Sequence, residues 1–65
     1  MNRNEILKTL IAKSGLTKKQ FAEKHGYKTY RIYDWTNGKR NISLFNLEVI
    51  AFKEHFNLTL ELEKR

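Results

Sequence analysis

The stretch that decides the fold runs from Leu16 to Gly38 and reads LTKKQFAEKHGYKTYRIYDWTNG. Ala22 is small enough for a second helix to cross closely, and Gly26 can adopt the left-handed conformation that ends a helix and turns the chain. Ile32 and Trp35 then recur at the spacing of an inward-facing stripe on the next helix. The stretch therefore predicts two short crossed helices joined by a tight turn.

Helix boundaries in and around this stretch have explicit local signals. Thr17 and Gln20 have the spacing of a capping box, in which side chains and backbone amides cap one another. Ser43 is typical of an N-cap for a later helix, and Gly15 of a stop for an earlier one. Apolar spacing between these signals predicts helices over 3–14, 17–25, 28–36 and 43–55. We therefore expect an all-α domain of four or five helices.

The helix expected over 43–55 has two neighbouring apolar faces. The face spaced to close the core consists of Leu44, Leu47, Ile50 and Ala51. The second face consists of Phe45, Val49, Phe52 and Phe56. A helix that is apolar on so much of its surface is covered on both sides. The cover of the second face is either another copy of the chain or the first helix or C-terminal segment of the same chain, and the two can coexist.

The apolar period changes after Asn57. Leu58, Leu60 and Leu62 alternate with polar residues, which predicts one half-buried C-terminal β-strand, although a frayed continuation of the preceding helix is the alternative. A lone strand in a helical chain needs a partner for its backbone groups, and the same strand of a second subunit supplies one about a two-fold axis. We therefore divide the chain into a helical domain, 1–56, and a dimerisation strand, 57–65.

The charge is unevenly distributed along the chain. Ten of the 13 lysines and arginines precede Ser43 together with three of the seven acidic residues, so that this part carries a net charge of +7. The remainder carries −1. This separation favours a polyanion-binding face and a separate structural or partner-binding end, the alternative being an ordinary solvated surface.

Several classes of function find no support in the sequence. The chain has no cysteine, and His25 and His55 lack the spacing of a metal-binding pair, so neither a metal nor another cofactor is indicated. The carboxylates are scattered and are interpreted as solvated charges, so we do not expect an enzyme. No apolar stretch is long enough for a signal peptide or a membrane span, and we expect a cytoplasmic protein without membrane contact.

The region from Leu16 to Leu60 resembles the XRE-type helix-turn-helix domains of Cro and phage repressors. Those domains commonly read L-T-Q-x-x-L-A, then G, then I-S-x-W-E-N-G, then a loop and L-x-x-L-x-x-I-A. The matching residues here are Leu16, Thr17, Ala22, Gly26, Ile32, Trp35, Asn37, Gly38, Leu44, Leu47, Ile50 and Ala51. The resemblance implies a lambda-repressor-like domain that binds operator DNA as a dimer, with helix 28–36 in the major groove. The leucine strand resembles the C-terminal strands that join subunits in Cro-like repressors and some antitoxins.

The resemblance also implies roles for individual residues. Base-reading positions are Thr29, Tyr30, Tyr33 and Asp34. Phosphate-contacting positions are Lys18, Lys19, Lys28, Arg31, Lys39, Arg40 and Asn41. The sequence departs from the family at Lys18, where glutamine is usual, and at Thr36, where glutamate is usual. Asp34 adds a negative charge to the proposed DNA face.

These observations predict a sequence-specific transcription regulator, namely a homodimeric repressor of a palindromic operator on double-stranded DNA. Such a protein is encoded by a bacterium or phage and is associated with the nucleoid through its operator. The alternative is an antitoxin that binds a toxin protein and regulates its own operon. In that case the second apolar face of helix 43–55 is a docking surface for the toxin.

Overall fold

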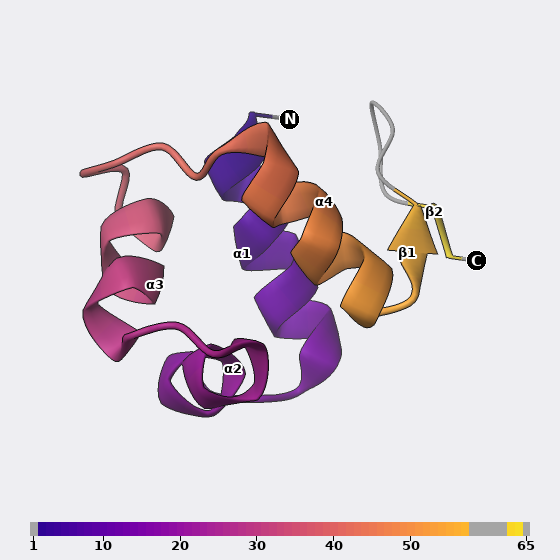
Figure 1. The fold of residues 1–65 in the computed structure, drawn as a ribbon, viewed down its shortest axis with the longest axis horizontal. Helices are drawn as coiled ribbons and strands as arrows, with labels where there is room; N and C mark the ends of the chain where they lie inside the picture. The colour runs from indigo at the N-terminus through magenta and orange to yellow at the C-terminus, as the bar shows by residue number, and fades with distance from the viewer. Residues whose placement is uncertain (1, 58–62, 65) are drawn as a thin grey trace.

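The computed structural model describes residues 2–57 and 63–64. Along these ranges the elements are α1 (Arg3–Ser14), α2 (Lys18–His25), α3 (Thr29–Thr36), α4 (Leu44–Lys53), β1 (Phe56–Asn57) and β2 (Glu63–Lys64). In Figure 1, α1 and α4 cross near the centre, α2 lies across one end, and α3 lies on the side opposite β1 and is joined to α4 by an extended loop. Each of the four helices predicted from the sequence is confirmed, within two residues at either end.

The local signals in the sequence account for these helix ends. The Thr17 hydroxyl accepts a hydrogen bond from the Gln20 amide at 3.1 Å, and the Gln20 side chain accepts one from the Thr17 amide at 3.0 Å. This is the capping box that the spacing predicts. Gly15 and Gly26 adopt φ values of 72° and 75°, at which the chain leaves α1 and α2. The turn between α2 and α3 is therefore determined by local sequence.

The last helix ends earlier than expected. The helix predicted over 43–55 extends two residues beyond the end of α4, which lies at Lys53. His55 has a φ of 66°, a left-handed conformation that stops the helix and that histidine adopts more readily than most residues other than glycine. The chain then turns directly into β1.

A single core joins the helices. Its buried apolar residues are Ile6, Leu7, Leu10, Ile11, Phe21, Ala22, Ile32, Trp35, Ile42, Leu47, Ile50 and Ala51. Tyr27 packs against this core and meets the Trp35 ring edge-on, with ring centroids 5.2 Å apart. Helix α3 packs against the core through one side only, so its opposite side is exposed.

The expectation that Leu44 closes the core is wrong. Leu44 is 51% exposed, whereas Ile42 in the loop just before α4 is fully buried. Leu44 is the first residue of α4, and Ile42 covers the core at this end of the helix. The start of α4 therefore adds a large apolar side chain to the surface.

The end of the described chain differs from the single strand expected there. β1 pairs antiparallel with β2, with Asn57 opposite Glu63 and Phe56 opposite Lys64. The expectation that the chain offers no strand partner of its own is therefore wrong, because these backbone groups pair within one chain. Leu58, Leu60 and Leu62 lie outside the described residues. No helix within the described ranges is long and apolar enough to cross a membrane.

Candidate nucleic-acid interface

The outward side of α3 displays the residues predicted to read bases. Tyr30 and Tyr33 are 61% and 49% exposed, and Thr29 and Asp34 are half-buried. These four positions are one and four residues apart, so they share one side of the helix. Ile32 and Trp35 face the core from the other side, so burial of α3 fixes which side chains point outward.

Thr36 has a structural role at the end of α3. It is buried, and its hydroxyl donates to the Ile32 carbonyl at 2.8 Å. This internal bond satisfies the hydroxyl of the buried side chain. The departure at this position therefore removes a charge from the region without leaving a buried polar group unpaired.

An open groove separates the exposed side of α3 from the start of α4. Its volume is about 590 Å³. The lining residues are Tyr30, Arg31, Asp34, Trp35, Lys39, Arg40, Asn41, Ser43 and Asn46. Three of the predicted phosphate contacts on this lining are cationic, and the two aromatic rings supply an apolar wall. The structure thus brings α3 and the following loop together into one concave, largely cationic surface.

Asp34 lies beside a cation within this groove. Its carboxylate is 3.8 Å from the Arg40 side chain, and its backbone carbonyl accepts a hydrogen bond from the Arg40 amide at 3.1 Å. An exposed pair at this distance contributes little to stability. Its effect is local, because the arginine offsets the negative charge that Asp34 adds to the face.

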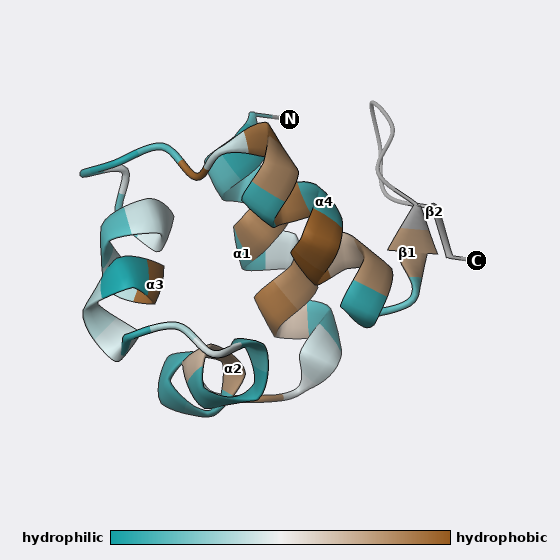
Figure 2. Ribbon diagram, viewed as in Figure 1, coloured by the Kyte–Doolittle hydropathy of each residue, from teal (hydrophilic) through white to brown (hydrophobic). Residues whose placement is uncertain are grey.

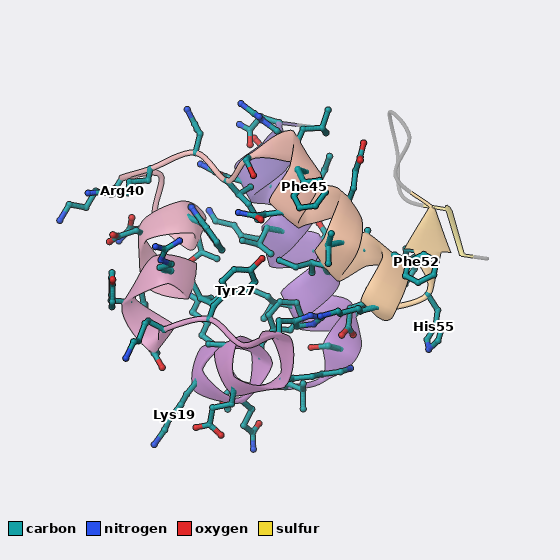
Figure 3. All side chains as sticks on the ribbon, viewed as in Figure 1. Lys19, Tyr27, Arg40, Phe45, Phe52 and His55 are labelled. Atoms are coloured by element: carbon teal, nitrogen blue, oxygen red, sulfur yellow. The ribbon has the colours of Figure 1, made fainter. Side chains whose placement is uncertain are left out.

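Lys18 and Tyr33 are in contact, although the sequence analysis predicted a phosphate contact for Lys18 and base reading for Tyr33. The Lys18 ammonium lies 4.8 Å from the centroid of the Tyr33 ring, within the range of a cation–π interaction. The contact joins the first residue of α2 to the exposed side of α3. Lys19, one residue further along α2, instead extends into solvent on the side of the molecule that also carries Arg40 (Figure 3).

The loop after α3 is tied to α1 by a residue that the sequence analysis did not single out. Asn4 donates to the Arg40 carbonyl at 3.3 Å and to the Asn41 side chain at 3.2 Å, and it accepts from the Ile42 amide at 3.3 Å. These partners are 36 to 38 residues away in the chain. No periodic or capping signal connects positions so far apart, which is why local reasoning missed Asn4.

A buried polar link connects α2 to the end of α4. His25 Nε2 is 2.8 Å from a Glu54 carboxylate oxygen that also lies 2.7 Å from the Lys24 ammonium. Burial lowers the pKa of His25 below its usual value, and the adjacent Glu54, which raises that pKa, does not fully offset the effect. The interpretation of Glu54 as a solvated charge is wrong, because its side chain is almost fully buried.

Glu54 remains ionised within this link. Burial raises the pKa of Glu54, but hydrogen bonds from Lys24 and His25 together with their charges outweigh that effect and leave the pKa below its usual value. None of the three side chains lines the groove. The link therefore holds α2 against α4 away from the α3 face.

The outer face of α4 contrasts with the groove. Phe45 and Phe52 are 73% and 62% exposed, and Figure 3 shows both on α4, away from α3. Val49 is half-buried, and Phe56 packs against the core with the Lys13 ammonium 5.8 Å above its ring. The stripe predicted from spacing is therefore divided, since Phe45 and Phe52 are exposed near the two ends of α4 and Phe56 is partly buried against the same chain.

Comparison with known proteins identifies the domain. A family model described as helix-turn-helix matches residues 7–51, more than two thirds of the chain. The match extends from α1 through most of α4 and includes α2, α3 and the groove. That family consists of DNA-binding regulatory domains and not of catalytic ones. No curated protein and no solved structure matches the chain.

Proposed function

Because the chain belongs to the XRE-type helix-turn-helix family of DNA-binding transcription regulators, we propose that it is a sequence-specific repressor that binds a palindromic operator as a homodimer. The observation that carries this proposal is the groove, where the exposed side of α3 meets a cationic loop. A groove of this composition suits a DNA strand whose phosphates lie along the loop while base edges face α3.

Base recognition is assigned to the exposed side of α3. Thr29, Tyr30 and Tyr33 offer hydroxyl groups for mixed polar contacts and apolar surface for a thymine methyl group. Asp34 is an acceptor suited to the exocyclic amine of cytosine. The Arg40 side chain beside it lowers the cost of bringing that carboxylate close to DNA. The contact between Lys18 and the Tyr33 ring supports a fixed orientation for Tyr33.

Phosphate contacts are assigned to the borders of the same surface. The proposed residues are Lys18, Lys19, Lys28, Arg31, Lys39, Arg40 and Asn41. All but Lys18 are exposed, and Lys39, Arg40 and Asn41 follow one another along the loop. Such contacts set the register of a protein on DNA and carry no sequence information directly. They also make the affinity for DNA fall with added salt. The logarithm of the binding constant falls linearly with the logarithm of the salt concentration, and this salt slope is about −0.9 per phosphate contacted.

The proposed dimer uses the outer face of α4. Leu44, Phe45 and Phe52 expose large apolar side chains that water solvates poorly, and exposed patches of this kind often mark interaction sites. When the two-fold axis of the dimer lies next to this face, the groove beside α3 stays exposed in each subunit. Two recognition helices then enter successive major grooves about 34 Å apart.

Selection from a random-sequence duplex pool tests this function. The expected result is enrichment of a two-fold symmetric sequence whose half-sites are about 10 base pairs apart. A matched selection with the Tyr30→Ala, Asp34→Ala variant should lose that enrichment while general DNA binding persists. Equal recovery of all sequences by the folded wild type contradicts sequence-specific binding.

A second candidate function is an antitoxin, and the exposed apolar face of α4 favours it. In this account Leu44, Phe45 and Phe52 dock a toxin protein, and the complex represses its own operon. Expression of the chain should then relieve the growth inhibition caused by one co-purifying protein, and Phe45→Lys should abolish that relief. A homodimer with this face buried at its two-fold axis counts against the antitoxin.

A further inference from the structure

The loop that carries Lys39 and Arg40 contains no regular secondary structure, yet it is held at several points. At its beginning, the Asn37 side chain accepts from the Lys39 amide at 3.0 Å, and Gly38 turns the chain with a φ of 82°. The Arg40 amide is bonded back to the Asp34 carbonyl on α3. These contacts hold the beginning of the loop against α3.

Asn4 fastens the other half of the loop to a different helix. Its amide group donates to the Arg40 carbonyl and the Asn41 side chain, and its oxygen accepts from the Ile42 amide. One side chain of α1 thus contacts three consecutive residues. In Figure 1 the loop passes from α3 to the neighbourhood of the first turn of α1 before α4 begins.

We propose that Asn4 is a positioning residue that holds the loop from Lys39 to Asn41 in the shape required for phosphate contact. This inference rests on the proposed DNA-binding function. An exposed loop without such a tether samples many conformations, and ordering it on binding reduces the affinity. Asn4 orders the loop before DNA arrives, because it fixes the peptide groups on both sides of Asn41.

The geometry separates this role from a simple contribution to folding. Asn4 is half-buried and lies in the first turn of α1, and its bonds reach only the loop and the first buried residue after it. The core residues of α1 are Ile6, Leu7, Leu10 and Ile11. Removal of the Asn4 side chain therefore loosens the loop while the packing of α1 on the other helices persists.

The test compares the affinity of three proteins for a random-sequence duplex over a series of salt concentrations. Asn4→Ala should bind roughly fivefold more weakly than wild type, with the salt slope reduced by about 1, because one phosphate contact is no longer held in place. Ser14→Ala is the matched control, since it removes a polar side chain that makes local hydrogen bonds at the other end of the same helix, far from the turn that carries Asn4. It should bind with wild-type affinity and slope under conditions in which it is folded.

A double-mutant comparison distinguishes positioning from stability. In a background in which Lys39, Arg40 and Asn41 are all replaced by alanine, Asn4→Ala should have no further effect on affinity, although its effect on thermal unfolding persists. Amide hydrogen exchange of Arg40 and Ile42 in the absence of DNA should be faster in Asn4→Ala than in Ser14→Ala. This exchange measurement reports on the loop without any DNA.

The outcomes separate the two proposals. If the folded wild type does not bind duplex DNA, the proposed function fails, and the role of Asn4 fails with it. If the wild type binds and Asn4→Ala binds equally well with the same slope, only the role of Asn4 is overturned. An equal loss of affinity in the background that lacks the Lys39, Arg40 and Asn41 side chains also overturns it, because the effect then does not pass through these loop side chains.

Discussion

The outer side of α3 and the outer side of α4 are both solvent-exposed, but they differ in chemistry. The α3 side combines tyrosine hydroxyls with the cations of the groove, whereas α4 exposes Leu44, Phe45 and Phe52. Figure 2 shows the same contrast, since α2, α3 and the loop are mainly teal to white and much of α4 is brown. The polar side suits a polyanion and the apolar side suits a protein surface.

This difference shows how a chain of 65 residues presents two chemically different surfaces around one small core. Each helix contributes one side to the core and leaves the other for solvent or a partner. Small domains bury a limited fraction of their surface, so an additional apolar contact between copies also contributes stability. The predictions below change one surface at a time and measure whether the other is affected.

The largest expected effect follows from removing charge from the loop. Lys39→Ala combined with Arg40→Ala should lower the affinity for random-sequence duplex on the order of fiftyfold at 0.1 M salt, because two phosphate contacts are lost. The magnitude of the salt slope should decrease by about 2. Fluorescence anisotropy across a salt series measures both. As a control, Lys8→Ala combined with Lys53→Ala removes the same amount of charge outside the groove. An equal loss of DNA affinity in this control contradicts the assignment of Lys39 and Arg40 to phosphate contact.

The next effect concerns the apolar side. Phe45→Lys should convert a dimer into a monomer in sedimentation or light-scattering measurements, because a charge would be buried at the proposed interface. Affinity for a single half-site should stay unchanged, while affinity for a full palindrome falls to the half-site value. Leu60→Lys is the comparison. If only Leu60→Lys gives a monomer, the dimer contact lies in the C-terminal segment and not on α4.

A smaller effect is expected from single side chains on α3. Tyr30→Ala should reduce discrimination at one base position on the order of tenfold, since one good base contact is worth about 1–3 kcal/mol. Binding to unrelated sequences should change little. Competition between the selected duplex and single-base variants measures this, and a uniform loss across all variants would assign Tyr30 to the phosphates.

The smallest effect expected is a pH dependence of stability, which involves neither surface. His25 has a lowered pKa in the folded protein, so the unfolded chain binds more protons as the pH falls below about 6.5. The lowered pKa of Glu54 acts in the same direction below about 4.5. The free energy of unfolding should therefore decrease on acidification, as followed by urea denaturation. His25→Gln should flatten the dependence between pH 7 and 5, and an unchanged dependence in this variant would contradict the role of His25.

Sequence reasoning succeeded where the determining contacts are local. The Thr17 capping box, the glycine turns and the Ser43 cap each depend on residues within a few positions, and all are present. The identity of the family also followed from such closely spaced signals. The helices and the turn between α2 and α3 were therefore predictable.

The remaining features depend on contacts between distant parts of the chain. The bonds of Asn4 to the loop and of His25 to Glu54 join positions about 30 to 40 residues apart, which no period or cap encodes. The exposure of Leu44 depends on Ile42 filling the core instead. The pairing of Asn57 with Glu63 likewise joins residues outside any local signal, and it gives these backbone groups a partner within the same chain, which the sequence did not predict.

The most direct test of the central claim is a nuclear magnetic resonance titration of Phe45→Lys with a duplex that contains one half-site. This variant removes changes caused by dimer formation. The account predicts that the largest amide shifts fall on α3 and on residues 39–41, with the outward residues of α4 nearly unchanged. Largest shifts on Leu44, Glu48 and Phe52, with α3 unaffected, would contradict the claim that the α3 side binds DNA.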